Sequence, residues 1–269
     1  TPGLLPDGEL PAEASTEETE VPAAYAASLE DTDAAFADGA LNENARPLID
    51  DGSPGVLEKT EGLRRVYLTF DDGPSPNTGK LLDILAEYNV KATFFVVGRE
   101  EESYRDIYRR IVEEGHTLGM HSYSHKYDEV YASLNAFTAD FAKEQTFLYE
   151  ITGVWPKFYR FPGGSSNNVT RTDMNEMIAF LQQQGVAYFD WNIACGDASG
   201  YRLSAEQIYR NVVYSVQEGE NVVLMHDALD KKTTLEALPR IIEGLLQSEN
   251  TELIPITEYT EPVHHIRSE

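Results

Sequence analysis

Cysteine is nearly absent from the chain, which contains only Cys195. A single cysteine excludes an intramolecular disulfide. The segment around it, Ile193-Ala194-Cys195-Gly196, has neither a nucleophile elbow nor a neighbouring histidine. We therefore expect Cys195 to be a small buried residue and not a nucleophile. Long apolar runs are absent as well, because no stretch of the sequence approaches the length of a membrane-spanning helix.

Basic residues are missing before Arg46, whereas Asp and Glu recur from Asp7 to Glu43. The same segment is rich in Ala, Pro and Thr and poor in large apolar residues. Because such a composition buries too little surface to offset chain entropy, residues 1–54 are predicted to be a flexible acidic spacer before a catalytic domain at 55–269. The chain begins at Thr1, so we expect any signal or anchor segment to lie upstream.

The net charge of the chain is −25 at pH 7. A surface this acidic repels the phosphates of nucleic acids and the headgroups of anionic lipids. We therefore expect neither of them as a partner, and we expect the protein to be a monomer.

Apolar segments typical of buried strands alternate with amphipathic segments typical of helices from Leu63 onward. This alternation indicates an α/β domain with a mostly parallel sheet, either open or closed into a barrel. The Ser75-Pro76 pair predicts a helix start, with Ser75 as the N-cap residue. Strands are predicted at residues 64–70, 92–97, 117–120, 158–161, 186–191, 222–225 and 253–256, and further helices at 102–114, 133–151, 172–184, 204–217 and 234–247.

Charged or imidazole side chains occur where several of the predicted strands end. Because the carboxyl ends of parallel strands meet at one edge of a sheet or barrel, we expect these side chains to form one shared site. The residues at these strand ends are Asp71, Asp72, His121, Arg160, Asp190 and His226.

Two of these clusters together predict a metal site. Asp71 and Asp72 stand before a Gly-Pro break, and His121 and His125 lie four residues apart. One carboxylate and two imidazoles make a three-ligand set with open positions, while the second carboxylate stays free to transfer protons. The sequence therefore predicts a metal-dependent hydrolase. Zinc, cobalt, nickel and manganese accept this ligand set, and so does the iron(II) of non-haem oxygenases, which are usually all-β proteins.

Five short motifs follow one another along the chain. They are Thr69-Phe70-Asp71-Asp72-Gly73-Pro74-Ser75, His121-Ser122-Tyr123-Ser124-His125, Arg160-Phe161-Pro162-Gly163-Gly164, Asp190-Trp191-Asn192 and Leu224-Met225-His226. Each motif alone is weakly specific, but five in order on compatible elements are highly specific. In these motifs and their order the chain resembles the polysaccharide deacetylase family, carbohydrate esterase family 4, from about Leu63 to Thr260. It is similar in particular to bacterial peptidoglycan N-acetylglucosamine deacetylases.

The resemblance implies a distorted (β/α) barrel of about seven parallel strands with an outer layer of helices. It implies hydrolysis of N-acetyl groups on a polysaccharide that contains N-acetylglucosamine, with release of acetate and with peptidoglycan as the expected substrate. The expected cofactor is a divalent metal, zinc before cobalt, nickel or manganese, and the expected location is the exterior or surface of a bacterial cell. The family pattern assigns the metal ligands to Asp72, His121 and His125.

The resemblance also assigns an acid and a base. Asp71 is expected to be the general base that takes a proton from the attacking water, and Arg160 is expected to keep it anionic. His226 is expected to be the general acid that protonates the departing amine, and Asp190 is expected to orient and charge it. Base and acid can then coexist, because each is held in its required state by its own partner.

Three further positions are expected to shape the substrate pocket. The backbone N–H of Gly163 is expected to bind the oxyanion, with Trp191 and Leu224 as apolar walls. Many family members carry tyrosine or another larger side chain at the position of Gly163, so this chain keeps the donor but loses a wall. Two alternatives remain open, namely O-deacetylation of acetylated xylan or a similar glycan, and a non-catalytic glycan-binding role.

Overall fold

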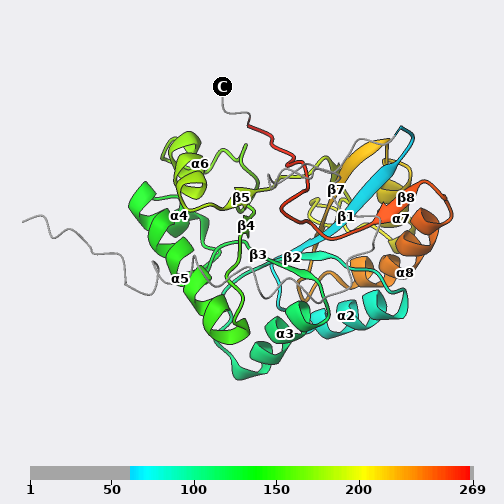
Figure 1. Cartoon of the computed structure of the whole chain (residues 1–269), viewed down its shortest axis with the longest axis horizontal. Coiled ribbons are helices and arrows are strands. Elements are labelled where there is room, and N and C mark those ends of the chain that lie inside the picture. Colours follow the sequence, from blue (N-terminus) through cyan, green and yellow to red (C-terminus); the bar gives the residue numbers. More distant parts are fainter. Residues whose placement is uncertain (1–60, 267–269) are drawn as a thin grey trace, which may run out of the picture. The chain divides into compact units, whose positions relative to one another are not determined.

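A curled sheet of parallel strands is the centre of residues 61–266, which are the residues described by this computed structural model (Figure 1). Its strands are β1 (Arg64–Asp71), β2 (Thr93–Val96), β3 (Thr117–Met120), β4 (Phe158–Tyr159), β5 (Ala187–Tyr188), β6 (Ile193–Ala194), β7 (Gly219–His226) and β8 (Thr251–Leu253). They follow the order β5-β4-β3-β2-β1-β7-β6, and β8 pairs with β1. The predicted distorted barrel of about seven parallel strands is confirmed, and the spacer predicted at residues 1–54 lies outside the described residues.

Strand β1 lies at the centre of the sheet and has three neighbours. On one side, β7 pairs with all eight residues of β1. On the other side, β8 pairs with residues 64–66 and β2 pairs with residues 69–71, so these two short strands share one edge of β1. The sheet therefore has seven positions although eight strands take part in it.

Helices cover the outer side of the sheet, as the family resemblance implies. They are α2 (Thr78–Glu87), α3 (Glu102–Glu113), α4 (Tyr127–Val130), α5 (Leu134–Thr152), α6 (Met174–Gln183), α7 (Ala205–Val213) and α8 (Lys232–Leu246). Figure 1 shows α8, α2, α3 and α5 following one another around the sheet, and each of them contacts the next.

Local sequence signals explain some of the helix boundaries. Ser204 and Gln207 form a capping box at the start of α7, and Gly153, in a left-handed conformation, ends α5. The predicted start of α2 is wrong, because the helix begins at Thr78 and its N-cap residue is Asn77. The Ser75 hydroxyl instead donates a hydrogen bond of 2.5 Å to the carboxylate of Asp227.

The two faces of β1 pack into different environments. Val66, Leu68 and Phe70 belong to the large core between the sheet and the helices. Tyr67, on the opposite face, belongs to a small cluster inside the barrel. Because side chains alternate along a strand, Thr69 and Asp71 share the face of Tyr67. Thr69 and Asp71 thus make the inner face polar at the carboxyl end of the strand.

The segment 263–266 covers the edge of the sheet at β5. The Asp190 N–H donates to the carbonyl of Val263 (2.8 Å), and the Tyr188 hydroxyl donates to the carbonyl of Ile266 (2.8 Å). The imidazole of His264 stacks on the ring of Tyr188 with 3.9 Å between the ring centroids. These contacts occupy hydrogen-bonding groups that an open sheet edge would expose.

Candidate active site

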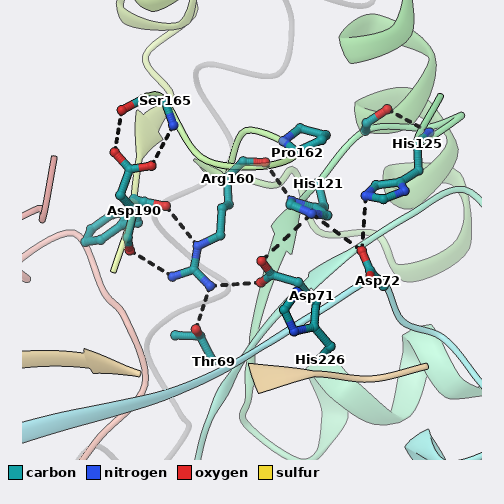
Figure 2. A network of polar contacts seen from close by, with 12 residues as sticks. Thr69, Asp71, Asp72, His121, His125, Arg160, Pro162, Ser165, Asp190 and His226 are labelled. Atoms are coloured by element: carbon teal, nitrogen blue, oxygen red, sulfur yellow. Dashed lines mark hydrogen bonds and ion pairs between the residues drawn. The ribbon is translucent and has the colours of Figure 1, made fainter. Parts of the chain in front are cut away.

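The strand ends carry the motif residues to one edge of the sheet. Asp71 ends β1 directly opposite His226, the last residue of β7. His121 follows the last residue of β3, and Arg160 follows the last residue of β4, which is paired with that end of β3. Figure 2 shows these side chains directed toward one centre, together with Asp72. The parallel register therefore brings residues that are far apart in the sequence into one polar site.

Asp72, His121 and His125 form a candidate metal site. Their ligand atoms all lie within 4.8 Å of one another. The Oδ1 atom of Asp72 is 3.1 Å from His125 Nε2 and 3.6 Å from His121 Nε2 (Figure 2). Among the described residues, none makes a hydrogen bond with this buried oxygen. An orphaned carboxylate oxygen that faces two imidazole nitrogens fits a divalent cation.

Both imidazoles are prepared to act as ligands. His121 Nδ1 lies 2.8 Å from the carbonyl oxygen of Arg160. Since a carbonyl oxygen only accepts, Nδ1 carries the hydrogen and Nε2 keeps its lone pair for a metal. Burial lowers the pKa of His125, and the neighbouring His121 lowers it further. The lowered pKa favours the neutral ring that metal binding requires.

The backbone that carries the ligands is strained. The φ angle is 75° at Asp72, 117° at Ser122 and 51° at His125. Non-glycine residues in such conformations cost about 1–3 kcal/mol each and persist only where the surrounding structure holds them. Strain of this kind, concentrated on two of the three candidate ligands, is typical of a functional site.

Two acidic residues of α5 hold the strained loop. Glu144 accepts hydrogen bonds from the backbone N–H groups of His121 (3.1 Å) and Ser122 (2.8 Å). Asp140, one helical turn earlier, accepts from the next two N–H groups of the loop at 2.8 and 3.0 Å. Burial raises the pKa of Glu144, and the charge of Asp140 raises it further. Sequence reasoning missed this pair, although its spacing of four residues places both carboxylates on one face of a helix.

Asp71 is held by the buried side chain of Arg160. The Asp71 Oδ1 atom accepts a hydrogen bond of 2.8 Å from Arg160 Nη1, and both side chains are almost completely shielded from solvent. The guanidinium also donates to Thr69 Oγ1 (2.6 Å) and to the carbonyl oxygens of Phe189 (2.9 Å) and Asp190 (3.0 Å). Figure 2 shows these hydrogen bonds, which together fix the position of the Arg160 guanidinium. The other carboxylate oxygen, Oδ2, faces His121 Nε2 at 3.8 Å, on the side of the metal site.

His226 is paired with Asp197, a residue that sequence reasoning missed. Asp197 Oδ1 lies 2.8 Å from His226 Nδ1, and its Oδ2 accepts from the backbone N–H of His226 (2.9 Å) and from the Thr234 hydroxyl (2.8 Å). Burial opposes the charged form of His226, but the hydrogen bond and the charge of Asp197 prevail and raise its pKa. The raised pKa favours the protonated imidazole, which is the form that can act as an acid.

The predicted pairing of Asp190 with His226 is wrong. Asp190 instead accepts from the Ser165 N–H (2.8 Å), the Ser165 hydroxyl (2.5 Å) and the His265 N–H (2.8 Å), and Figure 2 shows it directed away from His226. The strand order gives the reason, because β5 lies at one end of the sheet while β6 is the strand that pairs with β7. A carboxylate that follows β6 is therefore the one that reaches His226. The sequence feature that could have identified Asp197 is the Gly196-Asp197 pair, which follows the two-residue strand β6.

The remaining predicted residues line the same edge. Gly163 has a φ angle of 76°, and no group among the described residues accepts a hydrogen bond from its N–H. Trp191 is half-buried, and a Cβ atom placed on Gly164 would lie 3.0 Å from its ring. Leu224 precedes His226 by two residues, so both lie on the inner face of β7. All three positions are therefore compatible with a substrate pocket.

Comparisons with known proteins agree with the motifs. The family model described as polysaccharide deacetylase matches residues 58–178. A peptidoglycan-N-acetylglucosamine deacetylase of Bacillus cereus is 32% identical over 183 residues, which cover 66% of this chain and 64% of that protein. The bifunctional xylanase/deacetylase of Pseudobutyrivibrio xylanivorans is 35% identical over 187 residues, which cover 69% of this chain and 29% of that protein. The matches span less than two thirds of the length of these two relatives.

A solved structure decides the family. The catalytic domain of peptidoglycan N-acetylglucosamine deacetylase from Eubacterium rectale is 36% identical, with a TM-score of 0.72, and the match covers 81% of this chain and 99% of that domain. The chain belongs to the polysaccharide deacetylase family. The family resemblance drawn from the five motifs is thus confirmed, and the α/β fold excludes the usual all-β setting of the iron oxygenases.

The candidate metal site of this member of the polysaccharide deacetylase family can be tested by removing one proposed ligand. We expect His125→Ala to weaken zinc binding by about 100-fold or more, because the loss of a mere outer-sphere partner already costs about 10–100-fold. The measurement is calorimetric titration of the chelator-treated protein with zinc, together with the zinc content after dialysis. His265→Ala is the control, because His265 bonds the carbonyl of Trp191 and lies outside the cluster. Unchanged zinc affinity in His125→Ala would disprove the assignment.

Proposed function

We propose that the protein is a metal-dependent deacetylase that hydrolyses N-acetyl groups of an N-acetylglucosamine polymer and releases acetate. One observation supports this most directly: Asp71, which is paired with Arg160, lies beside the three candidate metal ligands and directly across from His226, which is paired with Asp197. A carboxylate paired with a guanidinium and an imidazole paired with a carboxylate, both beside one candidate metal site, can serve as the base and the acid that amide hydrolysis requires.

In this proposal Asp72, His121 and His125 hold the cation. When bound, a divalent cation supplies Lewis acidity that polarises the acetyl carbonyl and acidifies water. The softness and number of the ligands suit zinc, and cobalt, nickel or manganese also accept them. The proposed cofactor is therefore zinc, with these other metals as substitutes.

Asp71 is the proposed general base. Arg160 occupies Oδ1, so Oδ2 is the atom that takes a proton from the water attacking the acetyl carbon. The buried guanidinium stabilises the carboxylate anion, because an unpaired buried charge of either sign would be costly. The Gly163 N–H, which has no acceptor among the described residues, is the proposed donor to the oxygen that becomes negative during the attack.

His226 is the proposed general acid. It gives its proton to the amine nitrogen as the bond from that nitrogen to the acetyl carbon breaks. Asp197, in place of Asp190, orients the imidazole and favours its protonated form. Trp191 and Leu224 are the proposed apolar walls of the pocket, and Asp190 holds the wall that carries Trp191 by anchoring Ser165 and His265.

Peptidoglycan is the proposed substrate, since two of the three relatives described above carry that polymer in their names. Action on peptidoglycan would place the protein at the surface or exterior of a bacterial cell, with residues 55–269 as the catalytic domain. Within residues 61–266, none of the helices is both long enough and apolar enough to cross a bilayer.

Removal of O-acetyl groups from xylan is a second candidate function. A named relative is a bifunctional xylanase/deacetylase, and 69% of this chain matches it. Ester cleavage would use the same metal ligands and base but would depend less on His226, because an alkoxide leaves more easily than an amine anion.

Parallel assays of acetate release separate these substrates. The zinc-loaded protein is incubated with peptidoglycan, N-acetylchitooligosaccharides and acetylxylan, with chelator-treated protein as the blank. We expect zinc-dependent release from the first two substrates and little from acetylxylan. Release from acetylxylan alone would support the second candidate, and no release from any of the three would refute a deacetylase.

A further inference from the structure

Tyr127 lies at the rim of the metal site. It begins α4, two residues after the candidate ligand His125. The edge of one ring faces the other, with 5.6 Å between the ring centroids of Tyr127 and His125. The side chain is half-buried: one part packs against the hydrophobic core, and the rest is open to solvent.

The same phenol fills the space beside Gly163. A Cβ atom placed on Gly163 would lie 3.2 Å from Cε1 of Tyr127 and 3.3 Å from its hydroxyl oxygen. At the next residue, a Cβ atom on Gly164 would lie 3.0 Å from the ring of Trp191. Each glycine of the Gly163-Gly164 turn therefore lies close to one aromatic ring, and a side chain at either position would crowd that ring.

The Tyr127 hydroxyl has no hydrogen-bond partner in the part of the chain that the structure describes. The hydroxyl of Tyr131, one helical turn later, is by contrast engaged, since it donates a bond of 2.8 Å to the carbonyl of Pro162. The two tyrosines, at the first residue and the C-cap of α4, thus differ in their hydrogen bonding. Tyr131 fastens the turn that carries Gly163, whereas Tyr127 keeps a free donor beside it.

We propose that Tyr127 is a substrate-contacting residue, whose ring forms the wall next to Gly163 and whose hydroxyl donates a hydrogen bond to an oxygen of the bound acetamido sugar. The assignment rests on the proposed deacetylase function. Aromatic rings contribute large contact area at low entropic cost, and a hydroxyl on the ring adds direction. Together with Trp191, Tyr127 would bind the sugar from two sides of the Gly163-Gly164 turn.

The test compares Tyr127→Phe, Tyr127→Ala and the wild type on N-acetylchitooligosaccharides. Loss of a neutral hydrogen bond corresponds to about 3- to 10-fold, so we expect Tyr127→Phe to raise KM by that factor and to leave kcat unchanged. Tyr127→Ala removes the wall as well and should raise KM further. Tyr149→Phe, on an exposed ring that contacts Trp155, is the matched control and should leave both constants unchanged.

Zinc affinity separates substrate contact from a structural role through His125. We expect Tyr127→Phe to bind zinc like the wild type. A wild-type KM in Tyr127→Phe would overturn the proposal, and so would a fall in zinc affinity that accounts for the whole loss of activity.

Binding measured by calorimetry keeps the two proposals distinguishable. If the zinc-loaded wild type binds the oligosaccharide but releases no acetate, the deacetylase function fails, and a weaker affinity in Tyr127→Phe still supports the contact. If the wild type binds no oligosaccharide, the contact is refuted as well.

Discussion

Replacing Asp71 with Asn is expected to lower kcat by about 10²–10⁴-fold while the metal remains bound, since a positioned general base contributes this much to a proton transfer. An amide has no basic oxygen that can take the proton of water. It can still accept the hydrogen bond of 2.8 Å from Arg160, so the buried guanidinium keeps a partner. Acetate release and zinc content are measured on the same preparation.

A second Asp–Arg pair provides the control for this variant. Asp83 bonds Arg110 at 2.9 Å on the exposed outer face, where an ion pair contributes little. Asp83→Asn should therefore retain wild-type activity. Near-wild-type acetate release by Asp71→Asn would contradict the assignment of the base, and loss of its zinc would show that Asp71 acts as a ligand.

The sequence predicts the sheet well because long buried strands carry strong patterns. Strand β1 is a nearly continuous apolar run, and its predicted range of 64–70 differs from the observed Arg64–Asp71 by one residue. The range 117–120 is the same in prediction and structure, where it is β3. Two short elements, β6 and α4, are not predicted. Strand β6 has two residues and α4 has four, so neither contains enough residues to show a period.

The part of the site that can be predicted from the sequence is the part whose residues lie close together in the chain. The four-residue spacing of His121 and His125 and the two carboxylates at a strand end predict a three-ligand set, and the family resemblance assigns its carboxylate to Asp72. The ligand atoms of these three residues lie within 4.8 Å of one another. The partner of His226 depends on which strand lies beside β7, and this is a property of the whole sheet. Asp190 and Asp197 both follow strands, and only the pairing of β6 with β7 distinguishes them.

Replacing Asp197 with Asn tests whether Asp197 is the partner of His226, and its expected effect on activity is also large. We expect kcat to fall by about 10³-fold or more, because comparable loss of the carboxylate behind a catalytic histidine costs about 10⁴-fold. The pH profile gives the signature. Asp197 raises the pKa of His226 against the effect of burial, so without it that pKa falls. The imidazole then loses its proton at lower pH, and the alkaline limb of kcat moves toward lower pH.

Asp190→Asn is the matched control, because it alters an equally buried carboxylate that bonds Ser165 and His265 and makes no contact with His226. It is expected to loosen the wall that carries Trp191, which raises KM, and to leave the alkaline limb where it is in the wild type. Both variants are compared with the same metal bound, so any effect of the cation on His226 is common to them. A shift of the alkaline limb in Asp190→Asn, with none in Asp197→Asn, would contradict this assignment. It would mean that Asp197, although it lies 2.8 Å from His226, does not determine the pKa of the general acid.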